Sequence, residues 1–497
     1  MTGNDESRTI PGYFKGKNVL ITGGTGFVGL VLIEKLLRSC PEIRNIYLLM
    51  RHRRNKSPED RLKELVQQQL FDSVRKINPE VFNKLKPVSG DIAEVGLGLS
   101  EKDETVLISD TNIIYHVAAS VRFNDHFQDA VKMNLRSTVE VLNLALKCEN
   151  LEVYVHTSTA YCNSDVDGRI EEKVYRPSLD WRDALEMVDN GDKDVIETLT
   201  MKMIHPLKNT YTYTKRLAEQ AVVDICKDRI NAVILRPSIV MSTVHEPVSG
   251  WSNNLNGPFS LSVAGVMGIS STFFFSVKSE LDVVYVDNVA KSLIIATREK
   301  YINNDKSEVE VYNATSELMW KVANFESTYT LSRELVHFED TLWYYNVKMT
   351  HCFFLFYFWT MFHLAVASML DLILRIQGKR PRLVKLSRAI YNGQLAVHFF
   401  VCNKFDFVNG NYVTLDSKLS ESDKAAFQCR CFIPTGKFEQ IGYGLNALEG
   451  TKRYTFKEEM PTPDRLEKKH QLLCALQAVI EFVKPLLLVW IIYLCIF

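Results

Sequence analysis

The sequence has no excess of charge of either sign. Lys and Arg together number 59, Asp and Glu also number 59, and the formal net charge is zero. Because a basic surplus is the electrostatic footprint of nucleic-acid binding, its absence argues against nucleic acid as a partner. The ten cysteines are scattered, without a CxxC pair or a Cys/His spacing typical of metal sites. We therefore expect reduced thiols in a cytosol-facing protein, and no metal ion.

No secretory signal is visible at the start of the sequence, so none is expected, and long hydrophobic runs are few. Residues 1–16 are mostly polar and have none of the apolar stretch of a signal peptide. Two apolar runs stand out, one over 352–370 and one over 485–497. A spanning helix needs roughly 20 apolar residues, so either run could span a membrane, lie in its interface or pack inside protein. We expect membrane association and leave the number of spans open.

The order of predicted elements indicates an α/β fold. At 497 residues the chain is too long for one core, and we expect two or three domains. A short apolar strand over 17–22 precedes a glycine turn, a helix over 27–37 and a second strand over 44–50. Strands and helices then alternate, which predicts a doubly wound parallel sheet of the Rossmann type. One long helical stretch is expected over 59–82, and from about residue 330 the alternation is lost.

The glycine turn is the first motif that carries chemistry. It comprises Thr22, Gly23, Gly24, Thr25, Gly26, Phe27, Val28 and Gly29. Glycine permits a tight turn and lets backbone N–H groups reach a dinucleotide pyrophosphate, toward which the following helix directs its positive end. The alternative is a glycine-bearing turn without a ligand. A strand before the turn and a helix after it favour the nucleotide site.

The end of the second strand bears on the choice of cofactor. A reader of the ribose 2′-hydroxyl would be an Asp or Glu about 20 residues past the turn. The chain instead has Arg51, His52, Arg53 and Arg54 there. Guanidinium groups suit a 2′-phosphate by charge and geometry, although a solvated basic loop would read the same way. We predict NADPH as cofactor, with Arg51 as the principal contact and Arg54 beside it.

Two further turns are expected near the cofactor. Asp91 and Ile92 follow the third strand, where an acid could bond the adenine amine, although a bare turn is nearly as well supported. Val117, Ala118 and Ala119 follow the fourth strand. Their small side chains would allow the cofactor to approach the backbone closely, but small residues are common in turns.

Tyr211 and Lys215 are the predicted catalytic centre. Four residues apart on a helix, their side chains share a face. An ammonium beside a phenol stabilises the phenolate, which suits acid–base work. A hydroxyl at the end of the fifth strand, from Ser158 or Thr159, could polarise a substrate carbonyl. Tyr213 faces elsewhere on the same helix. The lone histidines, His116, His126 and His156, are expected to be core or surface groups.

These motifs resemble the extended short-chain dehydrogenases/reductases, and more specifically the fatty acyl-CoA reductases of animals, of an insect-like kind. The resemblance is carried by residues 17–29, 46–65, 156–163, 209–219, 235–240 and 246–258. It covers about residues 17–290 well. Residues 350–457 are more loosely similar to the C-terminal male-sterility domain of that family.

The resemblance implies a reaction and a domain plan. Such enzymes reduce a long-chain acyl-CoA with NADPH to the primary alcohol through an aldehyde, giving precursors of wax or ether lipids. It also implies that Pro237, Ser238 and Ile239 line the cofactor. The implied domains are a polar segment (1–16), a reductase domain (17–290) with a substrate part reaching about 345, a mainly helical membrane-associated domain (350–457) with its apolar segment (352–376), and an anchoring tail (471–497).

Location and alternatives follow from the same resemblance. The catalytic domain is expected to face the cytosol at the endoplasmic reticulum, a peroxisome or a lipid droplet, with membrane lipid as a partner and the oligomeric state open. A membrane-bound sterol dehydrogenase or a sugar epimerase would keep the glycine turn and the Tyr/Lys pair. A non-catalytic, lipid-associated protein of this fold would have no need of Tyr211 and Lys215.

Overall fold

The computed structural model describes residues 8–53, 56–253, 255, 259–275, 280–316, 320–344, 347–429, 437–458 and 463–496. The chain divides into two compact units, and each is assembled from three separate segments. The first unit comprises Met1–Ser249, Asp282–Met319 and Phe405–Ile433, and the second comprises Gly250–Leu281, Trp320–Lys404 and Pro434–Phe497.

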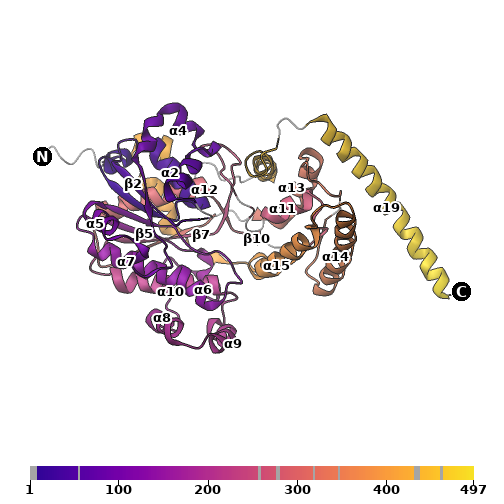
Figure 1. The fold of residues 1–497 in the computed structure, drawn as a ribbon, viewed down its shortest axis with the longest axis horizontal. Coiled ribbons are helices and arrows are strands. Elements are labelled where there is room, and N and C mark those ends of the chain that lie inside the picture. The colour runs from indigo at the N-terminus through magenta and orange to yellow at the C-terminus, as the bar shows by residue number, and fades with distance from the viewer. Residues whose placement is uncertain are drawn as a thin grey trace. The chain divides into compact units, whose positions relative to one another are not determined.

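A parallel sheet of seven strands forms the centre of the first unit (Figure 1). Its strand order is β12-β7-β5-β4-β1-β2-β3, which is the doubly wound order that the sequence predicted. Both faces are covered by helices, so the strands are almost continuously apolar. The strands are β1 (Asn18–Thr22), β2 (Asn45–Met50), β3 (Leu85–Ser89), β4 (Ile113–His116), β5 (Val153–Thr157), β7 (Ala232–Pro237) and β12 (Glu310–Ala314).

Helices cover the two faces of this sheet. Figure 1 shows α2 and α12 on one face and α7 and α10 on the other. The core beneath α7 and α10 is aliphatic, with Leu142 and Leu217 packed against Ile114 and Ile234 of the strands. The helices of this unit are α1 (Ile10–Phe14), α2 (Phe27–Ser39), α3 (Pro58–Val66), α4 (Asp72–Ile77), α5 (Glu101–Asp110), α6 (Phe127–Ala130), α7 (Ser137–Lys147), α8 (Trp181–Asn190), α9 (Lys193–Ile204), α10 (Thr210–Cys226), α12 (Val286–Asn303), α16 (Gly410–Thr414) and α17 (Glu421–Phe427).

The single helix predicted over 59–82 is wrong. The structure has α3, α4 and two short 3₁₀ turns there, and the last break falls at Asn78 before Pro79. The residue before a proline is pushed out of the helical region, and Asn78 has φ −158° and ψ 94° accordingly. Its side chain then accepts a hydrogen bond from the Glu80 N–H and starts the next turn.

Short strands complete the first unit. The pair β8 (Ile239–Met241) and β11 (Val283–Tyr285) is parallel, and so is the pair β6 (Arg169–Ile170) and β15 (Asp406–Phe407). Tyr161 makes edge-to-face contacts with Phe405, just before β15, and with Phe407 in β15. The centroids are 5.4 Å apart in both pairs. Part of the stretch that resembles a C-terminal domain therefore packs in the nucleotide-binding unit.

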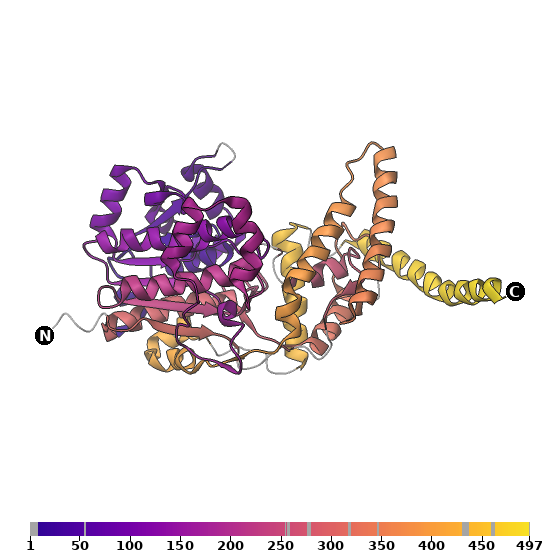
Figure 2. The same cartoon turned by 90° about the horizontal axis from the view of Figure 1, so that it is seen from below.

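The second unit is mainly helical, as predicted for the C-terminal part. Its helices α14 and α15 are joined by a short loop and pack against each other (Figures 1 and 2). Its helices are α11 (Phe259–Val266), α13 (Val322–Leu335), α14 (Phe353–Ile376), α15 (Leu383–Cys402), α18 (Lys437–Gly450) and α19 (Asp464–Ile496). Its strands are β9 (Thr272–Phe273), β10 (Glu280–Leu281), β13 (Trp320–Lys321) and β14 (Lys348–Met349).

The two apolar runs of the sequence both fall on helices of this unit. Within the described ranges, α14 is the one helix long and apolar enough to cross a membrane, with a mean hydropathy of 1.7. Only 11% of its most apolar window is buried. The run over 485–497 belongs to α19 up to Ile496, and its side chains lie outside the described residues.

Candidate active site

The carboxyl ends of the parallel strands bring the predicted site residues to one edge of the sheet. Strands β1, β2, β3, β4, β5 and β7 run in the same direction, so the loops that follow them share that edge. In doubly wound sheets ligands bind there, at the point where the strand order reverses. In this sheet the reversal lies between β1 and β4.

The glycine turn after β1 has the geometry of a phosphate cradle. The Gly26 N–H donates to the Gly23 carbonyl at 2.9 Å, and Gly23 has a φ of +76°. A Cβ on Gly23 would lie 2.6 Å from the Ala118 nitrogen, and one on Gly29 would lie 2.3 Å from the Gly23 carbonyl oxygen. Helix α2 begins at Phe27, and no side chain caps its first N–H groups. A dinucleotide pyrophosphate fits this helix terminus.

The other predicted cofactor residues lie along the same edge. The Val117 N–H donates to the Thr22 carbonyl at 3.2 Å, which holds the segment from Val117 to Ala119 against the glycine turn. Pro237 ends β7, and the Ser238 N–H donates to the Ala314 carbonyl at 3.1 Å. Ile239 then begins β8. The Asp91 carboxylate accepts the Ala93 N–H at 3.0 Å, so it stabilises the turn that holds Ile92.

Three arginines gather beyond β2. Arg51 is 56% exposed and lies 3.9 Å from the Asp91 carboxylate. Arg61 of α3 donates to the Arg51 carbonyl at 2.5 Å. Burial lowers the pKa of Arg61, and the positive charges of Arg53 and Arg51 lower it further. This concentration of positive charge suits an anion. Arg54 lies outside the described residues. Arg61 was not predicted, because it is ten residues past Arg51 and belongs to a helix that looked solvent-facing.

Tyr211 lies in the first turn of α10. The Asn209 side chain caps this helix by accepting the Thr212 N–H at 2.8 Å. The Tyr211 ring stacks on Phe123 with 5.7 Å between centroids, and its hydroxyl lies beside the Thr159 side chain, which favours the charged form of the phenol. Burial raises the pKa of Tyr211, so the phenol keeps its proton at neutral pH and is available as an acid.

The two candidate hydroxyls after β5 point to different partners. Thr159 lies beside the Tyr211 phenol and favours its charged form, whereas Ser158 lies beside the buried Glu219 carboxylate, helps to lower its pKa, and donates to the Cys162 sulfur at 3.9 Å. Both hydroxyl-bearing residues are largely buried. Of the two hydroxyls, that of Thr159 is therefore the one that lies beside the Tyr211 phenol.

Lys215 is buried one turn further along α10. Its Nζ donates to the Thr157 carbonyl at 2.6 Å and contacts His156 Nε2 at 3.2 Å. Burial lowers the pKa of Lys215 to about 8, and the Glu219 carboxylate opposes that shift. The predicted lowering of the Tyr211 pKa by Lys215 is not found. The ammonium is directed to the end of β5, and burial dominates at the phenol.

His156 is a site residue that the sequence reasoning missed. The ring is fully buried and burial holds its pKa well below the ordinary value, so the neutral ring can accept a hydrogen bond from the Lys215 ammonium. Among the described atoms its Nδ1 has no partner. Residues two apart on a strand share a face. The position of His156 two residues before Ser158 was the signal that would have found it.

A second missed feature is a buried ion pair beneath the site. Arg236 of β7 and Glu219 of α10 are both inaccessible to solvent. Arg236 donates from Nε to one Glu219 oxygen at 2.8 Å and from Nη2 to the other at 2.6 Å. Ser158 lies beside the same carboxylate and helps to lower its pKa, so the pair connects α10 and β7 to the end of β5.

Family models and curated relatives both match this chain. Two family models, both described as male sterility protein, match residues 21–293 and 362–458. The chain is 36% identical over 462 residues to fatty acyl-CoA reductase 1 of Homo sapiens, covering 91% of this chain and 87% of that one. It is 32% identical over 456 residues to fatty acyl-CoA reductase 2 of Mus musculus, with the same coverage.

Solved structures share the fold at low sequence identity. The terminal reductase domain of the myxalamid pathway matches with a TM-score of 0.60 and 17% identity, covering 90% of this chain and 93% of that one. The reductase domain of a nonribosomal peptide synthetase from Mycobacterium tuberculosis matches with a TM-score of 0.56 and 16% identity, covering 90% and 96%. These likenesses extend over both units of the chain.

Proposed function

This chain belongs to the fatty acyl-CoA reductase family, and from that premise we propose that it reduces long-chain acyl-CoA with NADPH to the primary alcohol, through the aldehyde. It is an oxidoreductase of the extended short-chain dehydrogenase/reductase fold, with a nicotinamide-binding glycine turn. The observation that carries the proposal is the placement of Tyr211 beside Thr159 and one helical turn from the buried Lys215, at the sheet edge that bears this turn.

Each residue then has a role that its position supports. Backbone N–H groups at the start of α2 would hold the pyrophosphate, and Lys215 would bond the nicotinamide ribose. Bound NADPH supplies hydride. The Tyr211 and Thr159 hydroxyls donate hydrogen bonds to the thioester carbonyl oxygen, where negative charge develops. After the thiolate of CoA leaves, the same two hydroxyls hold the aldehyde oxygen, and Tyr211 donates the proton that completes the alcohol.

The choice of Thr159 over Ser158 rests on their neighbours. The Ser158 hydroxyl lies between the Glu219 carboxylate, whose pKa it helps to lower, and the Cys162 sulfur, to which it donates at 3.9 Å. A Thr159 hydroxyl beside the phenol needs only to turn from Tyr211 to a carbonyl oxygen. We therefore assign the oxyanion contact to Thr159 and a structural role to Ser158.

The proposed activity is tested with the full chain, palmitoyl-CoA and NADPH. We expect NADPH oxidation, release of CoA thiol and accumulation of hexadecanol, with a pair of NADPH consumed for each alcohol. Adding a carbonyl-trapping hydrazine should divert part of the product to the aldehyde adduct. A preparation that binds NADPH but oxidises none of it with acyl-CoA, and instead oxidises a hydroxysteroid with NADP⁺, would refute the proposal.

The cofactor preference is tested by reversing one charge. We expect Arg51→Glu to weaken NADPH binding by about 10- to 100-fold, the worth of a charge-assisted hydrogen bond, and to leave NADH binding within a few-fold. Arg61→Glu should act in the same direction. Lys63→Glu, a charge reversal on the exposed face of α3, is the matched control, because its only described ionic partner is Asp60 of the same helix. Titration of cofactor fluorescence measures each constant. An unchanged NADPH-to-NADH ratio in Arg51→Glu would contradict the 2′-phosphate assignment.

A further inference from the structure

Helix α14 is amphipathic, but its large apolar side chains face outward and its inward face carries polar groups. Its inward stripe follows helical spacing through the buried Phe356, Ala367 and Asp371 and the half-buried Thr360, and so includes a hydroxyl and a carboxylate. Its outward residues are large and apolar. They are Phe353, Phe354, Leu355, Tyr357, Phe358, Met361, Phe362, Met369, Leu370, Leu372, Ile373 and Ile376. A soluble helix turns its apolar stripe inward, so this outward face is suited to a solvent other than water.

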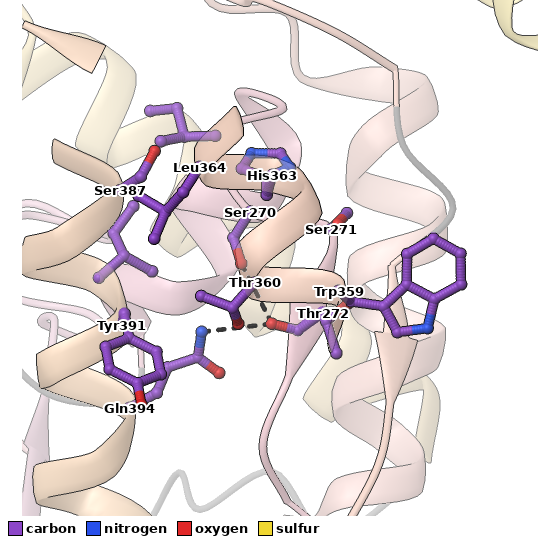
Figure 3. A pocket seen from close by; sticks show the side chains of 12 residues that line it. Ser270, Ser271, Thr272, Trp359, Thr360, His363, Leu364, Ser387, Tyr391 and Gln394 are labelled. Atoms are coloured by element: carbon purple, nitrogen blue, oxygen red, sulfur yellow. Dashed lines mark hydrogen bonds between the residues drawn. The ribbon is translucent and has the colours of Figure 1, made fainter. Parts of the chain in front are cut away.

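The inward stripe is fixed to the rest of the second unit. Thr360 and His363 line a small pocket together with Thr272 of β9 and Gln394 of α15 (Figure 3). In that pocket the Gln394 amide donates to the Thr272 carbonyl at 3.2 Å. The Phe356 ring stacks on Tyr391 of α15 with 5.6 Å between centroids. The inner face of α14 is therefore satisfied by protein, and its orientation is set.

Asp371 holds α14 and α15 together at their other end. Its carboxylate accepts the N–H groups of Arg382, Leu383 and Val384, each at 3.0 Å, and so caps the start of α15. Contacts run from this cap back to Phe356 and Tyr391, so α15 returns antiparallel along α14. A bilayer crossing by α14 would carry α15 into the hydrocarbon with it.

The composition of the connecting loop and of the helix ends beside it disfavours that crossing. Exposed basic residues are concentrated there, at Arg375, Lys379, Arg380, Arg382, Lys385 and Arg388. The only acidic groups described beside them are Asp371, which faces Arg375, and Asp340, which lies 3.4 Å from Arg382. With the first unit on the cytosolic side, a crossing would carry these basic side chains to the opposite side of the bilayer, against the tendency of basic residues to remain on the cytosolic side. At the headgroup level the same charges attract anionic lipid.

We propose that α14 lies in the plane of a membrane, with its outward face in the interfacial region and the basic segment 375–388, which includes the loop to α15, on anionic lipid headgroups. The helix is a monotopic contact and not a span. Its 24 residues would cover about 36 Å of surface at the ordinary helical rise. This surface is independent of the catalytic assignment, because none of its residues belongs to the first unit.

The test places a photoreactive probe on α14 itself, because vesicle binding by the whole chain would not separate α14 from the apolar run of α19. p-Benzoylphenylalanine replaces Phe358 on the outward face, and Phe356 on the inward stripe serves as the matched control. The full chain is illuminated with vesicles of phosphatidylcholine containing phosphatidylserine. We expect lipid adducts from position 358 at several times the yield from position 356. Adducts between two copies of the chain, or equal lipid yields from both positions, would overturn the proposal.

The charge and the topology are tested on the same probe. Lys379→Glu with Arg380→Glu should lower the lipid-adduct yield at limiting vesicle concentration about five-fold or more per charge, and removing phosphatidylserine or adding salt should act likewise. In reconstituted vesicles, trypsin added outside should cut the 375–388 segment in every molecule whose first unit is also outside. Protection of that segment while the first unit is digested would establish a span and refute the in-plane arrangement.

Discussion

Replacing Tyr211 by Phe is expected to lower kcat for acyl-CoA reduction by about 10²–10⁴-fold, the usual contribution of a positioned general acid. The change removes one oxygen that lies beside Thr159 and keeps the ring that stacks on Phe123. Cofactor affinity should therefore stay within a few-fold. Steady-state kinetics with palmitoyl-CoA and a separate NADPH titration measure the two effects.

Tyr213→Phe is the matched control, since it makes the same chemical change two residues along α10. That ring packs against Phe127 in the core and is remote from the sheet edge. We expect near-normal kcat from it.

The pH profile adds a readout that a structural defect would not move. Below pH 8 Lys215 carries its proton, because burial lowers its pKa to about 8, and kcat/KM of the unchanged enzyme should fall above that pH. Equal activities of the two Phe variants would remove Tyr211 from the mechanism.

The sequence predicted the parts of this site that are encoded locally. The glycine turn, the strand before it and the spacing of Tyr211 and Lys215 each depend on residues within one turn or one strand, so pattern alone placed them. The sequence also predicted the parallel sheet, because alternating strands and helices allow few other arrangements. Its error over 59–82 was local too, since Pro79 overrides the helical pattern before it.

What the sequence could not supply was contact between distant segments. The sequence around His156 does not show that β5 places this ring beside Lys215, which is 59 residues away. The return of Asp406–Phe407 to β6 rests on a pairing of two residues per strand, which is too short for a periodic signal. The hydroxyls of Ser158 and Thr159 could be distinguished only when Glu219 was seen to lie beside the first and Tyr211 beside the second.

Arg236→Met is expected to destabilise the first unit by about 3–5 kcal/mol, because it leaves the Glu219 carboxylate buried without its bidentate partner. Urea denaturation followed by tryptophan fluorescence measures the loss. The double variant Arg236→Met with Glu219→Met should recover most of it, since two apolar side chains of similar volume remove both desolvation costs. A double variant as unstable as the single one would mean that the contacts of Arg236 with the Glu171 and Lys173 carbonyls carry the energy instead.

The same pair gives the stability a defined dependence on pH. Burial by itself would raise the pKa of Glu219, but Arg236 and the hydrogen bonds from Ser158 and Cys162 outweigh it and hold the pKa below its ordinary value. A carboxyl whose folded pKa is lowered stabilises the fold above its unfolded pKa of about 4.3 and loses that contribution as the pH falls through the folded value. The double variant should lack this acid-sensitive component. Because Arg236 holds Glu219, and Glu219 lies beside Ser158, loss of Arg236 should disturb the end of β5. The Arg236→Met variant should therefore lose activity at urea concentrations below its unfolding midpoint.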